Sequence, residues 1–209
     1  MRKIFKLIPI LCGISSVAMA QDSTKTSPLT VSGSVDAYYR YNFNNTPDGG
    51  VYGFNSNTSF ANSQNSFQLG MASVKAAYTK GKVDAVIDLG YGTRAEEFSY
   101  ADGGTLFALK QAYISYSFTD KLKLTAGKWG THIGYEVLDP QANRNYSMSY
   151  MFSYGPFSHT GLKAEYAIND KHSVMIGIAN PTDFTRPEWA STKNIIAQYS
   201  YASDNFNLF

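Results

Sequence analysis

The stretch LTVSGSVDAYYRYNF, residues 29–43, decides the fold, because its side chains alternate between two kinds. Valine, alanine, tyrosine and phenylalanine, together with Gly33, occupy the odd positions from 31 to 43. Most of the even positions carry serine, aspartate, arginine or asparagine. Successive side chains of a β-strand point to opposite faces, so this pattern predicts one strand with an apolar face and a polar face.

The same alternation recurs along most of the chain. It is regular in residues 83–91, 160–168 and 172–180, and less regular in residues 66–78, 106–118, 122–129 and 194–202. Within residues 66–78 the apolar face changes sides near Met71, which predicts a β-bulge there. The sequence therefore predicts an all-β chain of about eight strands.

The connections between these strands alternate between short and long. Residues 79–82, 119–121, 169–171 and 203–205 are short polar turns that carry Gly, Asn or Asp. Residues 44–65, 92–105, 130–158 and 181–193 are much longer. Outer-membrane barrels have short periplasmic turns and longer outside loops, whereas a soluble β-sandwich has no reason to place every long loop at one end. We therefore expect a transmembrane antiparallel up-and-down β-barrel.

The polar faces of the strands would point into the lumen of such a barrel, because the apolar faces meet lipid. Buried charges are costly without water, so these positions indicate a wet interior. An alternative is a narrow barrel plugged by pairing of its inner charges, for example Arg40 with an acidic neighbour. The predicted pore-lining residues are Asp36, Arg40, Asp88, Gln111, Lys163, Glu165 and Gln198.

The N-terminus has the pattern of a secretory signal peptide, residues 1–20. Arg2, Lys3 and Lys6 precede a short apolar segment, and small residues precede an expected cleavage between Ala20 and Gln21. The alternative is an uncleaved membrane anchor. Residues 21–28 would then be a periplasmic segment and residues 29–209 the barrel domain, in which no apolar run reaches the roughly 18 residues of a membrane helix.

Composition argues against several other functions. Without the signal peptide the chain carries 15 basic and 16 acidic residues, a net charge of −1 that offers no basic patch for nucleic acid. Its only cysteine, Cys12, lies in the signal peptide, and three scattered histidines give no metal-ligand spacing. Ser158 and His159 are strand neighbours that point to opposite faces, so they do not form a catalytic pair. We expect no enzymatic activity, metal or cofactor.

The connection at residues 130–158 is the longest and is rich in aromatic residues. Long loops of this kind are usually functional or disordered, and the many rings argue against disorder. We hypothesise that this loop packs against the inner wall and narrows the pore. The alternative is an aromatic belt with an outer cap. The residues expected near the constriction are Glu136, Asp139, Arg144, Tyr146 and Tyr150.

The last residues, 206–209, form a stub that is too short to cross a membrane. A ninth strand would also give an odd count, against the even number usual in bacterial single-chain barrels. We therefore expect the barrel domain to be incomplete at its C-terminus.

Several motifs resemble one known family. They are GKWGT at 127–131, IGYE at 133–136, NRNYS at 143–147, SYMF at 149–152, GPF at 155–157, HTG at 159–161, DLGYGTRA at 88–95 and KQAY at 110–113. Together they resemble the OmpL-like β-barrel porin-2 family of Bacteroidetes-type bacteria over residues 31–201. The resemblance implies an outer-membrane channel of poorly known substrate, in a family whose members are usually longer, and it carries over no catalytic residue.

The expected function is a porin-like channel for passive diffusion of small hydrophilic solutes or ions. The alternative is a non-conducting barrel that serves as a receptor, an adhesin or a structural anchor. The expected location is the bacterial outer membrane. The expected partners are outer-membrane lipid, the barrel-assembly machinery during biogenesis, the solutes or ions themselves and, as a possibility left open, further copies of the chain.

Overall fold

A computed structural model describes residues 27–43, 59–187, 191–203 and 207–208, and most of these residues lie in β-strands. The predicted signal peptide, its cleavage site at Ala20 and Gln21, and most of the segment at 21–28 lie outside the described residues. The strands are β1 (Leu29–Arg40), β2 (Ser66–Lys80), β3 (Val83–Tyr91), β4 (Leu109–Ser117), β5 (Leu122–Gly130), β6 (Ser158–Ala167), β7 (His172–Ala179), β8 (Asn194–Ala202) and β9 (Asn207–Leu208).

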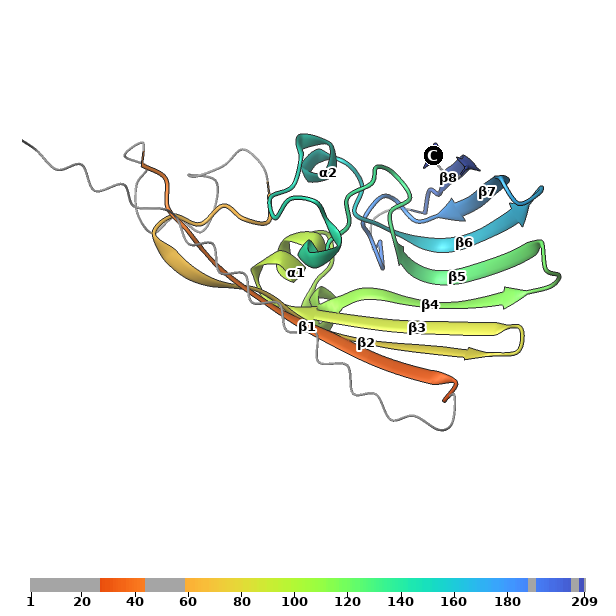
Figure 1. Cartoon of the computed structure of the whole chain (residues 1–209), viewed down its shortest axis with the longest axis horizontal. Coiled ribbons are helices and arrows are strands. Elements are labelled where there is room, and N and C mark those ends of the chain that lie inside the picture. The colour runs from red at the N-terminus through yellow and green to blue at the C-terminus, as the bar shows by residue number, and fades with distance from the viewer. Residues whose placement is uncertain (1–26, 44–58, 188–190, 204–206, 209) are drawn as a thin grey trace, which may run out of the picture.

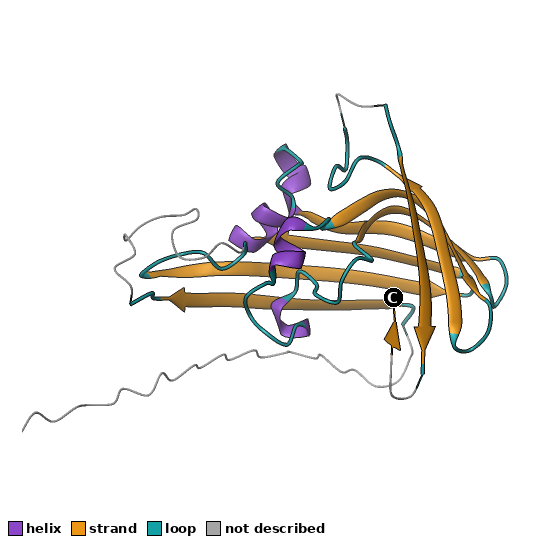
Figure 2. Ribbon diagram, turned by 90° about the horizontal axis from the view of Figure 1, so that it is seen from above, coloured by secondary structure: helices purple, strands orange, loops and turns teal. Residues whose placement is uncertain are grey.

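Within the described residues the strands form one nine-stranded sheet in which each strand pairs antiparallel with the next in the sequence. This is the predicted up-and-down arrangement. The sheet is not closed, since β1 pairs only with β2 in the part of the chain that the structure describes. Figures 1 and 2 show the sheet as a curved surface rather than a flat one.

Short turns and long connections lie at opposite ends of the strands, as the sequence predicts. Figure 1 shows the turns after β2, β4 and β6 at one end and the long connections at the other. The long connections hold the four short helices of the described residues. These are α1 (Thr93–Phe98), η1 (Gly104–Ala108), η2 (Pro140–Ala142) and α2 (Tyr150–Tyr154).

Two sequence predictions about these segments need correction. The strand expected from residue 106 begins only at Leu109, because residues 106–108 belong to the 3₁₀ helix η1. Residues 130–158 are not a structureless loop, since they contain η2 and α2. Ser149 caps α2, and its side-chain oxygen accepts a hydrogen bond from Phe152 N at 3.3 Å. The three helices responsible, η1, η2 and α2, are only three to five residues long. Helices this short leave almost no periodic signal in a sequence.

The two faces of the sheet differ in polarity. We call the face that carries α1 and the 131–157 connection the inner face, and the opposite one the outer face. Buried side chains of the inner face include charged and hydroxyl groups such as Asp88, Ser115 and Thr125. The outer face is apolar and exposed, and its side chains include Val31, Val35, Val74, Ile87, Ile114, Leu162, Ile176 and Ile195.

A β-bulge in β2 confirms the predicted change of face near Met71. Asp36 pairs with Met71 and the next residue, Ala37, pairs with Leu69, so Gly70 is the extra residue. The bulge leaves Leu69 exposed on the outer face while Met71 is fully buried on the inner face. An added methyl group at Gly70 would overlap the Asp36 carboxylate, so a larger residue here would have to displace that side chain.

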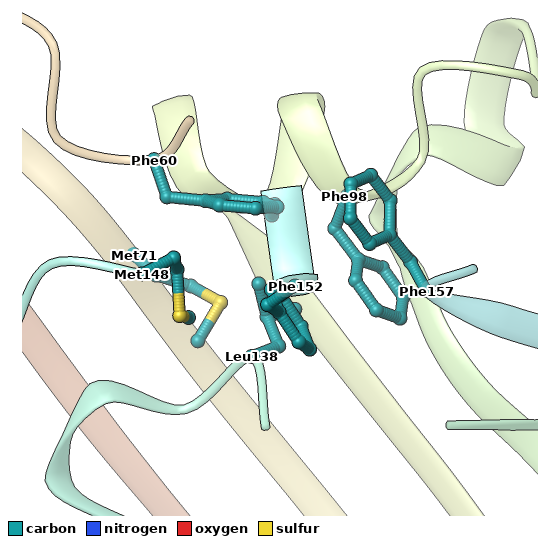
Figure 3. Close-up of a cluster of buried hydrophobic side chains, with 8 residues drawn as sticks. Phe60, Met71, Phe98, Leu138, Met148, Phe152 and Phe157 are labelled. Atoms are coloured by element: carbon teal, nitrogen blue, oxygen red, sulfur yellow. The ribbon is translucent and has the colours of Figure 1, made fainter. Parts of the chain in front are cut away.

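An apolar cluster packs the connections onto the inner face. Its members are Met71 of β2, Ala95 and Phe98 of α1, Phe152 of α2, and Phe60, Leu138, Met148 and Phe157 from the connections. Figure 3 shows these aromatic rings and methionines gathered around α2. The Phe60 ring centre lies 5.6 Å from that of Phe152 and 5.2 Å from that of Phe157. Burying such a side chain contributes about 1.5–3 kcal/mol, so this cluster helps to hold the connections on the sheet.

Candidate functional site

The inner face carries buried charges that pair with one another. Lys110 Nζ lies 3.1 Å from Asp88 Oδ1, and both side chains are almost fully buried. The same Nζ lies 2.7 Å from Asp139 Oδ1. Lys128 Nζ lies 2.9 Å from Asp102 Oδ2, again with both side chains buried. Unpaired charges would be very costly at these positions, so each pair holds two segments of the chain together.

Lys110 reaches the inner face through a second β-bulge. Asp88 pairs with Gln111 and Leu89 pairs with Leu109, so Lys110 is the extra residue of β4. Alternation alone assigns Lys110 to the outer face, which is why sequence reasoning missed it. The one available signal was the charge itself, because a lysine among lipid-facing positions would be unfavourable.

The 131–157 connection, which we call the long loop, is fixed to β1 near its middle, at Tyr146. Tyr146 Oη donates a hydrogen bond to Asp36 Oδ2 at 2.8 Å. Arg94 of α1 lies behind this contact, fully buried, with its Nε 3.8 Å from Asp36 Oδ2 and its Nη2 donating to Tyr146 O at 3.2 Å. Burial, followed by the hydrogen bond to Asp36, raises the pKa of Tyr146, so the hydroxyl stays protonated and remains a donor.

The start of the long loop, at Thr131 and His132, is fixed to β6 and β8. Gln198 of β8 donates through Nε2 to His132 O at 3.0 Å. Thr131 Oγ1 lies 3.2 Å from His159 Nε2 of β6. The long loop therefore crosses the inner face from β8 to β1, and the charges of β3 and β4 lie beneath it.

The neighbouring connections are tied to each other across the same end of the sheet. Asp102, which follows α1, accepts hydrogen bonds from Thr185 N at 2.9 Å and Thr185 Oγ1 at 2.6 Å. Asp183 accepts from Phe157 N, Ser158 N and Tyr100 Oη. Burial raises the pKa of Asp183, and these donors oppose the shift. The connections form one interlocked layer.

All seven predicted pore-lining residues lie on the inner face, according to the strand register. Asp36 and Asp88 are engaged by Tyr146 and Lys110, and Gln111 Nε2 donates to Asp88 Oδ2 at 3.4 Å. Arg40 donates a hydrogen bond to Ala61 O. Lys163 Nζ lies 3.2 Å from Glu165 Oε1, and Gln198 holds His132. That these residues line a pore stays a prediction.

The five predicted constriction residues take different places. Asp139 and Tyr146 contact the inner face through Lys110 and Asp36. Glu136 is buried and accepts hydrogen bonds from the backbone and hydroxyl of Ser149, so it organises α2. Arg144 and Tyr150 are exposed. Lys110, Arg94 and Lys128, which sequence reasoning did not select, contribute more of the buried charge.

The polarity of the two faces and the up-and-down topology are those of a β-barrel membrane protein. A family model described as putative beta-barrel porin-2, OmpL-like, matches residues 28–209. The chain belongs to this family. A search of curated proteins finds no match for this porin-2 family chain. Among the described residues, no helix is long and apolar enough to cross a membrane, and no three acidic, histidine or cysteine side chains gather as metal ligands.

Proposed function

We propose that this porin-2 family protein is a channel of the bacterial outer membrane through which small hydrophilic solutes or ions diffuse passively. One observation carries the proposal: apolar side chains are exposed on the outer face while charges are buried on the inner face. A water-soluble protein has the reverse arrangement. Lipid requires apolar contact and fully paired backbone groups, which a sheet of this polarity provides once it is closed.

Two groups of exposed aromatic side chains support the membrane placement. Tyr39 and Phe67 pack together near the long connections, with ring centres 4.8 Å apart, and Tyr91 is also exposed at that end. Tyr116 and Phe118 pack together beside the short turns, with ring centres 4.9 Å apart. Aromatic residues gather at both membrane–water interfaces of outer-membrane barrels. These two groups lie near opposite ends of the strands, where the two interfaces would be.

Charged groups outside the buried pairs support a wet passage. Lys123 and Asp84 form an ion pair at 2.8 Å whose side chains are about 41% and 30% exposed, and Glu165 is 42% exposed. These groups lie on the inner face toward the short turns, away from the long loop. Water in contact with them is what a diffusion path requires.

The second candidate is a non-conducting barrel that acts as an anchor, receptor or adhesin. The long loop favours it, because the loop covers the inner face from β8 to β1 and engages Asp36, Lys110 and Gln198. In this view the paired charges fill the interior rather than line a path.

Conductance separates these two functions. Full-length protein is inserted in a planar lipid bilayer, and current is recorded at several salt concentrations, with an unrelated outer-membrane anchor barrel as the control. Discrete steps that grow with salt concentration support the channel. If insertion is verified by protease protection and no steps rise above the control, the anchor is correct.

The location and processing of the chain belong to the same proposal. We expect export by the signal peptide, cleavage between Ala20 and Gln21, and insertion by the barrel-assembly machinery of a Gram-negative cell. Fractionation of cells, followed by N-terminal sequencing of the outer-membrane form, tests this route. Recovery of the protein from the soluble fraction would contradict it.

A further inference from the structure

The fold brings two of the three histidines together at the start of the long loop. His132 follows β5 and His159 lies on β6, where it pairs with Trp129 of β5. The two imidazole ring centres are 5.1 Å apart and the ring planes are tilted by 40°. No sequence pattern predicts this pair, because 27 positions separate the two residues and no ligand motif connects them.

Both imidazoles carry a buried ring nitrogen that lacks a partner. Neither His132 Nδ1 nor His159 Nδ1 has a hydrogen-bond partner among the described residues, and His159 is only 4% exposed. Leaving such a buried group unsatisfied costs about 1–3 kcal/mol, so two adjacent ones need an explanation.

The surroundings hold the two rings in place. Thr131 Oγ1 lies 3.2 Å from His159 Nε2, the nitrogen that is not orphaned. Gln198 fixes the backbone of His132 through its carbonyl oxygen. Histidines that bind metals commonly have their second ring nitrogen engaged in this way, which orients the first.

We propose that His132 and His159 form a two-imidazole binding site for a divalent transition-metal ion such as Cu²⁺, Ni²⁺ or Zn²⁺. Two imidazoles that share one ion at about 2.0–2.1 Å have ring centres about 5 Å apart, which is the spacing present here. Water or solute completes the coordination, because no further acidic, histidine or cysteine side chain joins the two imidazoles among the described residues. The site is independent of the proposed channel function.

Nearby charges make this a site of modest affinity. Lys163 Nζ lies 5.3 Å from the Trp129 ring centre, close enough to repel a cation at the histidines, and Glu165 offsets part of that charge. Imidazole ligands favour Cu²⁺ over Ni²⁺ and Zn²⁺. We therefore expect Cu²⁺ to bind most tightly, and Ni²⁺ and Zn²⁺ more weakly.

Trp129 provides a built-in reporter, since its ring centre lies 6.5 Å from that of His159. The chain has two tryptophans, so Trp189→Phe leaves Trp129 as the only one. Cu²⁺ is titrated into this variant in detergent micelles while tryptophan fluorescence is recorded. We expect saturable quenching with one ion per chain and, in electron paramagnetic resonance spectra, nitrogen ligation of the bound Cu²⁺.

Three further variants make the test specific. His132→Gln and His159→Gln should each weaken Cu²⁺ binding at least tenfold, whereas His172→Gln, which changes the one histidine outside the pair, should leave it unchanged. Lys163→Gln should tighten binding severalfold, an effect that a purely structural histidine pair would not show. His132 lies in a loop, so its variant keeps the test valid if His159→Gln fails to fold. Absence of saturable quenching, or quenching that survives His132→Gln, overturns the proposal.

Discussion

Tyr146 and Asp36 are joined by a hydrogen bond of 2.8 Å although 110 positions separate them in the sequence. Tyr146 belongs to the long loop and Asp36 to β1, so this contact fixes the loop across the sheet. Arg94 supports it from behind and donates to Tyr146 O. The contact is therefore the most direct place to test whether the long loop controls the interior.

Removing the Tyr146 hydroxyl should loosen the long loop. A hydrogen bond to a charged group contributes about 1.5–3 kcal/mol, so Tyr146→Phe should raise amide hydrogen exchange in residues 131–157 at least tenfold. Mass spectrometry of exchanged peptides measures this change. Tyr150→Phe is the matched control, because Tyr150 is exposed. Amide exchange in this variant should match that of the wild type. Equal exchange in both variants would show that the contact does not hold the loop.

A methyl group at Gly70 should have the same effect by another route. Gly70→Ala places the methyl group against the Asp36 carboxylate and about 3.0 Å from Tyr146 Oη, so the hydrogen bond must lengthen or break. Combined with Tyr146→Phe it should add little further exchange, because both changes remove one interaction. Gly103→Ala is the control, as a methyl group there meets open space. Full additivity of the two changes would contradict this account.

Lys110 should be essential for stability, because it forms ion pairs with two carboxylates at once. Lys110→Met leaves Asp88 buried without its cation, which costs about 3–5 kcal/mol. Adding Asp88→Asn should restore part of the loss. Lys123→Met, which breaks the half-exposed pair with Asp84, should cost at most about 1 kcal/mol. Urea unfolding in lipid vesicles measures these differences, and similar losses for both lysines would refute the argument.

A charge on the outer face should hinder membrane insertion. Ile87 is exposed at the middle of β3, so Ile87→Arg places a guanidinium against lipid at a cost of about 2–4 kcal/mol. The folded fraction after refolding into vesicles should fall accordingly, as heat-modifiable electrophoretic migration shows. Tyr135→Arg, at an exposed position of the long loop, should fold like wild type. Normal insertion of Ile87→Arg would place the outer face in water.

Local alternation was sufficient to predict most of the strands and most of their faces. The predicted strands at 83–91 and 194–202 coincide with β3 and β8, and the change of face at Met71 matches the bulge at Gly70. Each of these features is set by a few consecutive side chains, which is the information that a single sequence carries.

Contacts between distant segments lay beyond that information. Lys110 at the β4 bulge pairs with a buried carboxylate from β3 and with a partly exposed carboxylate from the long loop. The pairing of His132 with His159 depends on the register of β5 with β6 and on Gln198 of β8. No local pattern encodes either arrangement. The sequence therefore predicted the face of the sheet on which the site residues lie, but not the residues that they contact.

The interlocked connections have a consequence for the order of assembly. Asp102 is held by Thr185, and Asp183 is held by Tyr100 and Ser158. In the Asp102–Thr185 and Tyr100–Asp183 contacts, strands β4 to β7 all lie between the two residues in the sequence. A nascent chain can form its hairpins one after another, but these links can be made only once β7 and the segment after it have arrived. Surface segments such as residues 99–105 should therefore remain cleavable by an external protease until late in biogenesis, and then become resistant in a single step.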